Sequence, residues 1–199
     1  MKNILRIFVS VLIVGATFTA CDDYLDRQPD EQLTQEQIFQ KAKTTEQYLT
    51  NVYSYQPNYS DPSGQTLPWA PCADESSIAF TGRSYTQINY DTWDPSINLQ
   101  RSHTYNNIYK GIREASYFMQ HVYECPEISD IDKGYMYNEA RFLRAYFYSE
   151  LLRAFGGVPL ITKVLSMDDP EIKSERDSFK TILDFIVGEC EDAAELLKS

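Results

Sequence analysis

Apolar side chains recur at steps of three, four and seven residues between positions 105 and 123, and this spacing restricts the fold more than any other feature. The positions are Tyr105, Ile108, Tyr109, Ile112, Met119, Val122 and Tyr123. One face of an α-helix repeats in this way, so the spacing predicts an amphipathic helix of roughly five turns. Pro126 closes that helix, and Ser129 or Asp130 can open the next one. So short a connection predicts that the two helices form an antiparallel hairpin.

The second of these helices carries two apolar stripes, which predicts that it packs on two sides. One stripe comprises Met136, Ala140, Leu143, Phe147 and Leu151, and the other contains Phe142 and Tyr146. Gly156-Gly157 supplies a left-handed stop, and Pro159 prevents the helix from resuming.

A final helix is predicted from about Ser178 to Lys198. Its apolar residues are Phe179, Ile182, Leu183, Ile186, Cys190, Ala193, Ala194 and Leu197. The predicted fold class is therefore mainly α, with stacked helical hairpins like those of an α-solenoid. Only residues 159–162 read as a short strand.

The first half of the chain combines short helices with a long irregular segment. Thr34-x-x-Gln37 resembles a capping box and Thr44-x-x-Gln47 is a second start signal, so two short helices are predicted there. From Gln56 to Ser96 the helical pattern fails, and the segment contains five prolines and both tryptophans. Because structureless segments of this length are usually functional or mobile, we expect a binding site here.

The first twenty residues have the pattern of an export signal. Lys2 and Arg6 precede the apolar residues 7–14, a stretch too short to span a membrane as a helix. The signal ends at Ala20, directly before Cys21. Cleavage there leaves Cys21 either as an ordinary first residue or, in the interpretation we favour, as the lipidated cysteine of a bacterial lipoprotein. Residues 1–20 are then the signal peptide, 21–33 a lipidated tether and 34–199 the helical domain.

Three cysteines remain: Cys72, Cys125 and Cys190. Their spacing fits neither a zinc ligand set nor a thiol-disulfide motif. One disulfide with a free thiol stays open, and the sequence does not select the pair. Cys190 lies on an apolar helical face, so we expect it in the core.

Composition argues against several classes of function. The chain has 18 basic and 29 acidic residues and a net charge of −11, without the basic stripe that nucleic-acid binding needs. His103 and His121 are its two histidines, and Gly156-Gly157 leads into Val158-Pro159 rather than into a helix as in a phosphate loop. Asp74 and Glu75 are adjacent and cannot flank a glycosidic bond from opposite sides. We therefore predict neither catalysis nor a cofactor or metal, and a surface or cap position for His121.

The remaining charged clusters are interpreted structurally. Arg141 and Arg144 lie three residues apart, and ion pairs to neighbouring helices are favoured over a ligand role. Asp168-Asp169 and Glu189-x-Glu191-Asp192 are expected on solvated faces, with calcium binding as the minor alternative.

Three segments resemble the SusD/RagB family of outer-membrane nutrient-binding lipoproteins. They are the start from Cys21 to Pro29, the segment Ile108–Ser116, and the most specific one, Glu139–Ile161. Ser116 departs from the asparagine that is usual there. The resemblance covers essentially the whole mature chain.

The resemblance implies a non-enzymatic, lipid-anchored protein on the bacterial surface, associated with a SusC-like TonB-dependent transporter. It implies capture of oligosaccharides, or of peptides in some members, with tetratricopeptide-like hairpins as a scaffold and loops as the ligand site. Aromatic rings stack on sugars while polar groups bond the hydroxyls. The expected ligand residues are therefore Trp69, Arg83, Tyr85, Tyr90 and Trp93. Trp93 is equally well interpreted as a core anchor.

Three further expectations follow. A helical docking subunit of the transporter, with little ligand contact, is the alternative function. Family members are typically more than twice as long as 199 residues, so residues 34–199 are expected to be the N-terminal part of a longer protein. An exposed apolar surface on the last helix is expected for the same reason.

Overall fold

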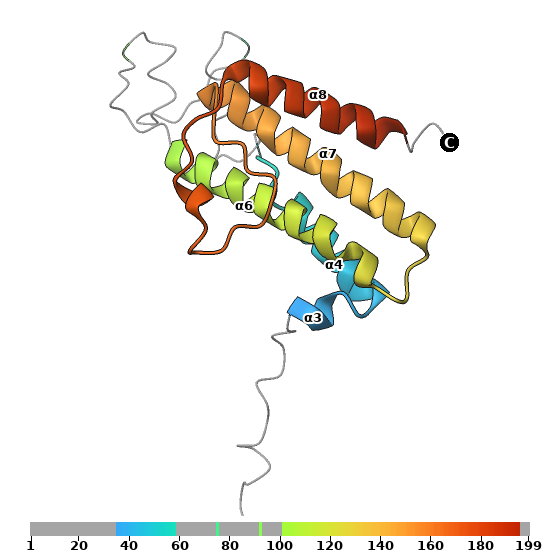
Figure 1. Ribbon diagram of the computed structural model, residues 1–199. Coiled ribbons are helices and arrows are strands. Elements are labelled where there is room, and N and C mark those ends of the chain that lie inside the picture. The colour runs from blue at the N-terminus through green and yellow to red at the C-terminus, as the bar shows by residue number, and fades with distance from the viewer. Residues whose placement is uncertain (1–34, 59–74, 76–91, 93–100, 196–199) are drawn as a thin grey trace, which may run out of the picture. The chain divides into compact units, whose positions relative to one another are not determined.

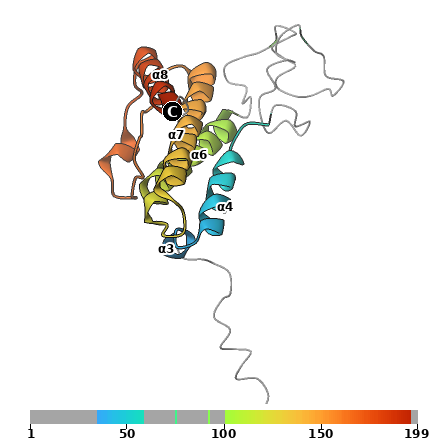
Figure 2. The same ribbon diagram turned by 90° about the vertical axis from the view of Figure 1, so that its right-hand side faces the viewer.

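Three long helices lie side by side in the computed structural model: α6 (Arg101–His121), α7 (Asp130–Phe155) and α8 (Phe179–Glu195). Successive helices run in opposite directions, with α7 between α6 and α8 (Figure 1). The shorter α3 (Gln35–Ile38) and α4 (Ala42–Tyr53) precede them, and α4 packs on α6 and α7 (Figure 2). The structure describes residues 35–58, 75, 92 and 101–195, which belong to the unit Gln35–Ser199. This confirms the predicted mainly α fold and its antiparallel hairpins.

Helix α6 buries the predicted apolar stripe. Ile108, Ile112, Met119 and Val122 are nearly or fully inaccessible to solvent, whereas Tyr123 is exposed. The helix begins four residues before the first predicted apolar position and continues into a 3-10 turn, Val122–Glu124. Burying each such aliphatic side chain contributes roughly 1.5 to 3 kcal/mol, so this face is a main source of stability.

Both predicted ends of α7 are confirmed. The Ser129 hydroxyl accepts a hydrogen bond from the Asp132 amide at 3.1 Å, and Asp130 and Asp132 place negative charge in the first turn. Both features satisfy the helix N-terminus. At the other end Gly156 has φ of 71° and ψ of −141°, a positive-φ conformation that glycine adopts without strain, and its amide donates to the Leu152 carbonyl.

Helix α7 is packed on two sides, as predicted; in the second stripe Tyr146 packs against the core, but Phe142 does not. Ala140, Leu143, Phe147 and Leu151 are buried in the core. Phe142 is 51% exposed instead of packed.

The start of α4 differs from the sequence prediction. The helix begins at Ala42, so the Thr44 and Thr45 hydroxyls lie inside it and bond to the carbonyl oxygens of Ile38 and Lys41. The first amide is satisfied from a distance, because Ala42 N donates to the Glu127 carboxylate at 2.9 Å. A carboxylate at a helix N-terminus is electrostatically favourable. A side chain of the α6–α7 connection thereby caps the first turn of α4.

Residues 158–162 have no regular secondary structure, and the described residues contain no strand, so the strand prediction was wrong. Side chains bond to the backbone groups that a partner strand would have paired. The Tyr148 hydroxyl donates to Ile161 O at 2.8 Å and accepts from Ile161 N at 2.7 Å, and the Tyr109 hydroxyl donates to Pro159 O at 2.7 Å. Burial raises the pKa of both tyrosines, which therefore remain donors. The chain then forms the 3-10 turn η3 (Pro170–Lys173) and enters α8, where Ser178 caps the Thr181 amide.

Candidate functional site

The predicted ligand and lipid residues lie outside the described part of the chain. These are Cys21, Trp69, Arg83, Tyr85, Tyr90 and Trp93. They therefore stay predictions. The described helices contain three further arrangements that bear on function: an ion-pair network and two surface hollows.

The ion-pair network joins α7 to α8. The Glu189 carboxylate accepts from Arg141 Nε at 3.0 Å through one oxygen and from Arg144 Nε at 3.0 Å through the other. Arg141 also pairs with Asp192, and Arg144 donates to Thr162 O at 3.0 Å. Arg144 and Glu189 are each only 7% exposed. The structural interpretation of the two arginines is therefore confirmed.

Glu189 was assigned to a solvated face, and that prediction was wrong. The spacing of an acidic run does not tell which carboxylate faces a buried arginine. The prediction of a solvated face is correct for Glu191 and Asp192, which are both exposed; Asp192 pairs with Arg141 at the solvent-exposed edge of the network. Asp169 bonds to the Glu171 amide at 3.1 Å and lies 3.5 Å from Lys163 Nζ. Within residues 35–58 and 101–195, no three His, Cys, Asp or Glu side chains are grouped so that they could hold a metal.

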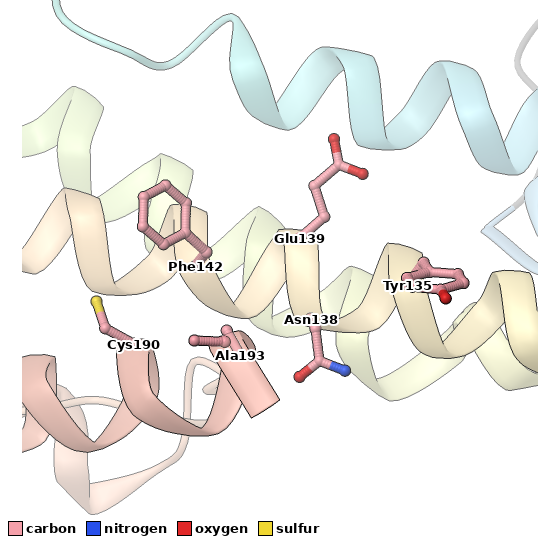
Figure 3. Close-up of a pocket in the computed structure, with 7 residues that line it drawn as sticks. Tyr135, Asn138, Glu139, Phe142, Cys190 and Ala193 are labelled. Carbon is pink, nitrogen blue, oxygen red and sulfur yellow. The ribbon is translucent and has the colours of Figure 1, made fainter. Parts of the chain in front are cut away.

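An apolar groove lies between α7 and α8. Its volume is about 430 Å³, and it is lined by Tyr135, Asn138, Glu139, Phe142, Cys190, Ala193 and Ala194 (Figure 3). Cys190 is a half-buried free thiol at this groove rather than a core residue, so the core prediction was wrong; Cys125 is the fully buried free thiol. Burial, together with the charge of Glu189, raises the pKa of the Cys190 thiol, which makes it a poor nucleophile.

A second hollow lies on the other side of the same α7 residues, against α4. Its volume is about 380 Å³, and it is lined by Glu46, Leu49, Thr50, Tyr53, Asp132, Tyr135, Met136 and Glu139. Glu139 extends from α7 towards α4 (Figure 3), where it accepts a hydrogen bond from the Tyr53 hydroxyl. Burial, reinforced by this bond, raises the pKa of Tyr53 to about 12, so its hydroxyl stays protonated at neutral pH.

Sequence reasoning missed both hollows. Tyr53 and Glu139 are 86 residues apart, and only the α4–α7 contact brings them together. The available signal was weak: tyrosine and carboxylate residues at exposed helical positions, which are ordinary on any surface. His121 was placed correctly, since it lies at the end of α6 and its Nδ1 is 2.9 Å from the Glu124 carboxylate.

Comparison with known proteins identifies the family. A model of SusD-like proteins, described as "Starch-binding associating with outer membrane", matches residues 23–199. The chain belongs to the SusD-like family. The SusD/RagB resemblance read from the sequence is thereby confirmed.

Similar SusD-like proteins agree in sequence and in fold. SusD-like protein P38 of Formosa agariphila is 27% identical over 98% of this chain. The crystal structure of a SusD-like protein from Bacteroides fragilis matches 80% of this chain with a TM-score of 0.68 and 26% identity, over 30% of its own length. A structure named as a laminarin-binding SusD-like protein matches 79% of this chain and 34% of its own, with a TM-score of 0.65 and 17% identity. The chain spans 38% of the length of the curated relative.

None of the helices within residues 35–58 and 101–195 combines the length and apolar content that a membrane crossing requires. The association with the outer membrane comes from the family description.

Proposed function

We propose that this SusD-like chain belongs to a non-enzymatic lipoprotein of the outer membrane that captures oligosaccharides. The observation that carries the proposal is the family match over residues 23–199, because that family is described as starch-binding and outer-membrane-associated. The fold similarity to a laminarin-binding protein supports a glucan as the ligand. Since the chain spans 38% of its curated relative, part of a complete site can lie elsewhere in a longer protein.

The proposed ligand residues are the loop aromatics with Arg83. Trp69, Tyr85, Tyr90 and Trp93 offer planar rings for stacking, and the guanidinium can bond to sugar hydroxyls. The flanking helices support this role, because α4 and α6 pack closely. An added Cβ at Gly111 of α6 would lie 2.9 Å from the Cβ of Tyr55, two residues after the end of α4, and 2.9 Å from the Phe147 ring of α7. A rigid helical pair is a suitable base for a binding loop.

Calorimetric titration with maltohexaose and laminarihexaose tests glycan capture. We expect binding that weakens when Trp69→Ala and Trp93→Ala are combined, and is unchanged in Tyr123→Ala. Tyr123 is the matched control because it is exposed and stacks only on Tyr137 among the described rings. If neither glucan nor a wider glycan array shows binding, while a peptide library does, the ligand class is peptide and the glycan proposal is wrong.

The proposed anchor is a lipid on Cys21, and the proposed partner is a SusC-like TonB-dependent transporter. Both follow from the family resemblance of the leader and of the helical segments. Metabolic labelling with a palmitate analogue should mark the natural protein and not Cys21→Ala. Affinity purification from solubilised outer membrane should recover a TonB-dependent transporter; its absence would contradict the partner proposal.

A docking subunit with little ligand contact is the second candidate. It is favoured by the exposed apolar side chains on α8 and α7, namely Phe142, Phe179, Leu183 and Val187. Transporter recovery and glycan uptake that persist after the loop aromatics become alanine would favour docking alone.

A further inference from the structure

We propose that the hollow between α4 and α7 is a second glycan-contact site, distinct from the predicted loop site, and that it accepts neutral sugars. The inference rests on the proposed glycan-binding function and adds a place and a charge preference to it. The feature that points to a sugar is an aromatic platform beside hydrogen-bond acceptors in one open depression.

Two tyrosine rings flank the hollow from different helices. Tyr53 is 38% exposed on α4, and Tyr135 is 44% exposed on α7. The hydroxyl of Tyr53 is fixed by its bond to Glu139, whereas the hydroxyl of Tyr135 has no such bond among the described residues. Leu49 and Met136 complete an apolar floor in a space of about 380 Å³, which falls in the size range of small-ligand sites. The Tyr135 ring is therefore the surface on which the apolar face of a pyranose can stack.

The polar groups around these rings are acceptors, and sugar hydroxyls are donors. In the described part of the chain, nothing engages the Glu46 carboxylate. Asp132 accepts from the Ser129 hydroxyl through Oδ2 at 2.6 Å, which leaves Oδ1 available, and Glu139 keeps one oxygen beyond its bond to Tyr53. The Thr50 hydroxyl already donates to the Glu46 carbonyl at 3.0 Å, so its oxygen can only accept. A ligand rich in hydroxyl donors complements this arrangement.

The charge of the lining residues decides which sugars fit. The charged residues that line the hollow are three carboxylates, and neither Lys nor Arg lines it. A uronic acid or a sulfated sugar would bring a like charge next to Glu46, Asp132 and Glu139, which is unfavourable. The site is therefore selective for neutral glycans such as glucans.

Methionine-methyl NMR gives a local readout, because the chain has four methionines and, among the three in the described residues, only Met136 lines the hollow. Met119 is buried in the core and Met167 is almost fully exposed on the α7–α8 connection, so their methyl signals serve as internal controls. Titration with maltohexaose and laminarihexaose should shift the Met136 signal and leave Met119 and Met167 in place. An oligogalacturonate of matched length should leave Met136 unchanged.

Substitutions separate this site from the loop site. Tyr135→Ala should weaken the Met136 response about three- to tenfold, as loss of a ring contact predicts, and Tyr135→Phe should retain it. The response should persist when Trp69→Ala and Trp93→Ala are combined.

A Met136 signal that stays in place while tryptophan fluorescence reports glycan binding would overturn the second site and leave the proposed function standing. If neither response appears with these glucans or with a wider glycan array, the second site and the proposed glycan capture are both overturned. Equal shifts with the galacturonate and the glucans would overturn the charge selection.

Discussion

Glu189→Gln is expected to destabilise the fold far more than the loss of one surface charge would. The carboxylate accepts from both Arg141 and Arg144, and the Arg144 side chain is almost fully buried. Removing one partner of a buried ion pair leaves the other charge uncompensated, at a cost of about 3 to 5 kcal/mol. Arg144 keeps its bond to Thr162 O and lies 3.3 Å from Ser116 Oγ, which argues for the lower end, about 3 kcal/mol.

Urea unfolding followed by circular dichroism measures this cost. With a slope of about 2 kcal/mol per molar urea, Glu189→Gln should lower the midpoint by about 1.5 M. Asp192→Asn is the matched control, because its side chain is 55% exposed and pairs only at the rim. An exposed pair contributes about 0 to 1 kcal/mol, so the control midpoint should fall by less than about 0.5 M.

The double variant Arg144→Met with Glu189→Met tests the reasoning further. Because it removes both charges, it should be more stable than Glu189→Gln. Equal midpoints for Glu189→Gln and Asp192→Asn would show that the network is solvated, and the argument from burial would fail.

Three other predictions follow from local geometry. Gly157→Ala should lower the free energy of unfolding by about 2 kcal/mol or more, because an added Cβ would lie 2.0 Å from the Asp177 carbonyl oxygen. Gly188→Ala is the control: its added Cβ meets no atom within 4 Å, so the variant should be as stable as the natural protein or more stable. Thermal unfolding of the two variants checks this. Glu127→Gln should lower stability by about 0.5 to 1 kcal/mol and speed amide exchange in the first turn of α4, since it removes a charged cap; unchanged exchange rates would contradict that role. The raised pKa of Tyr53, about 12, means that its contribution to stability is present below pH 10 and lost as the pH rises towards 12, and Tyr53→Phe should remove this part of the alkaline profile.

The helices were predicted well from the sequence where the apolar spacing agrees with the start and stop signals. The buried stripe of α6, the Ser129 cap and the Gly156 stop are all local features that a helix requires whatever surrounds it. The segment 158–162 was mistaken for a strand because its backbone groups need hydrogen-bond partners, which a neighbouring strand usually provides. Here Tyr109 of α6 and Tyr148 of α7 supply them from helix side chains.

The errors on α7 and α8 share one physical cause. The sequence pattern assigned Phe142 and Cys190 to contacts and the acidic run 189–192 to solvent, but the α7–α8 contact is partly ionic and Glu189 is the partner of the two arginines. Arg141, Arg144 and Glu189 take the facing positions, so Phe142 and Cys190 are turned out of the contact and line the groove instead. The same buried charges that hold the two helices together therefore leave apolar side chains available at the surface.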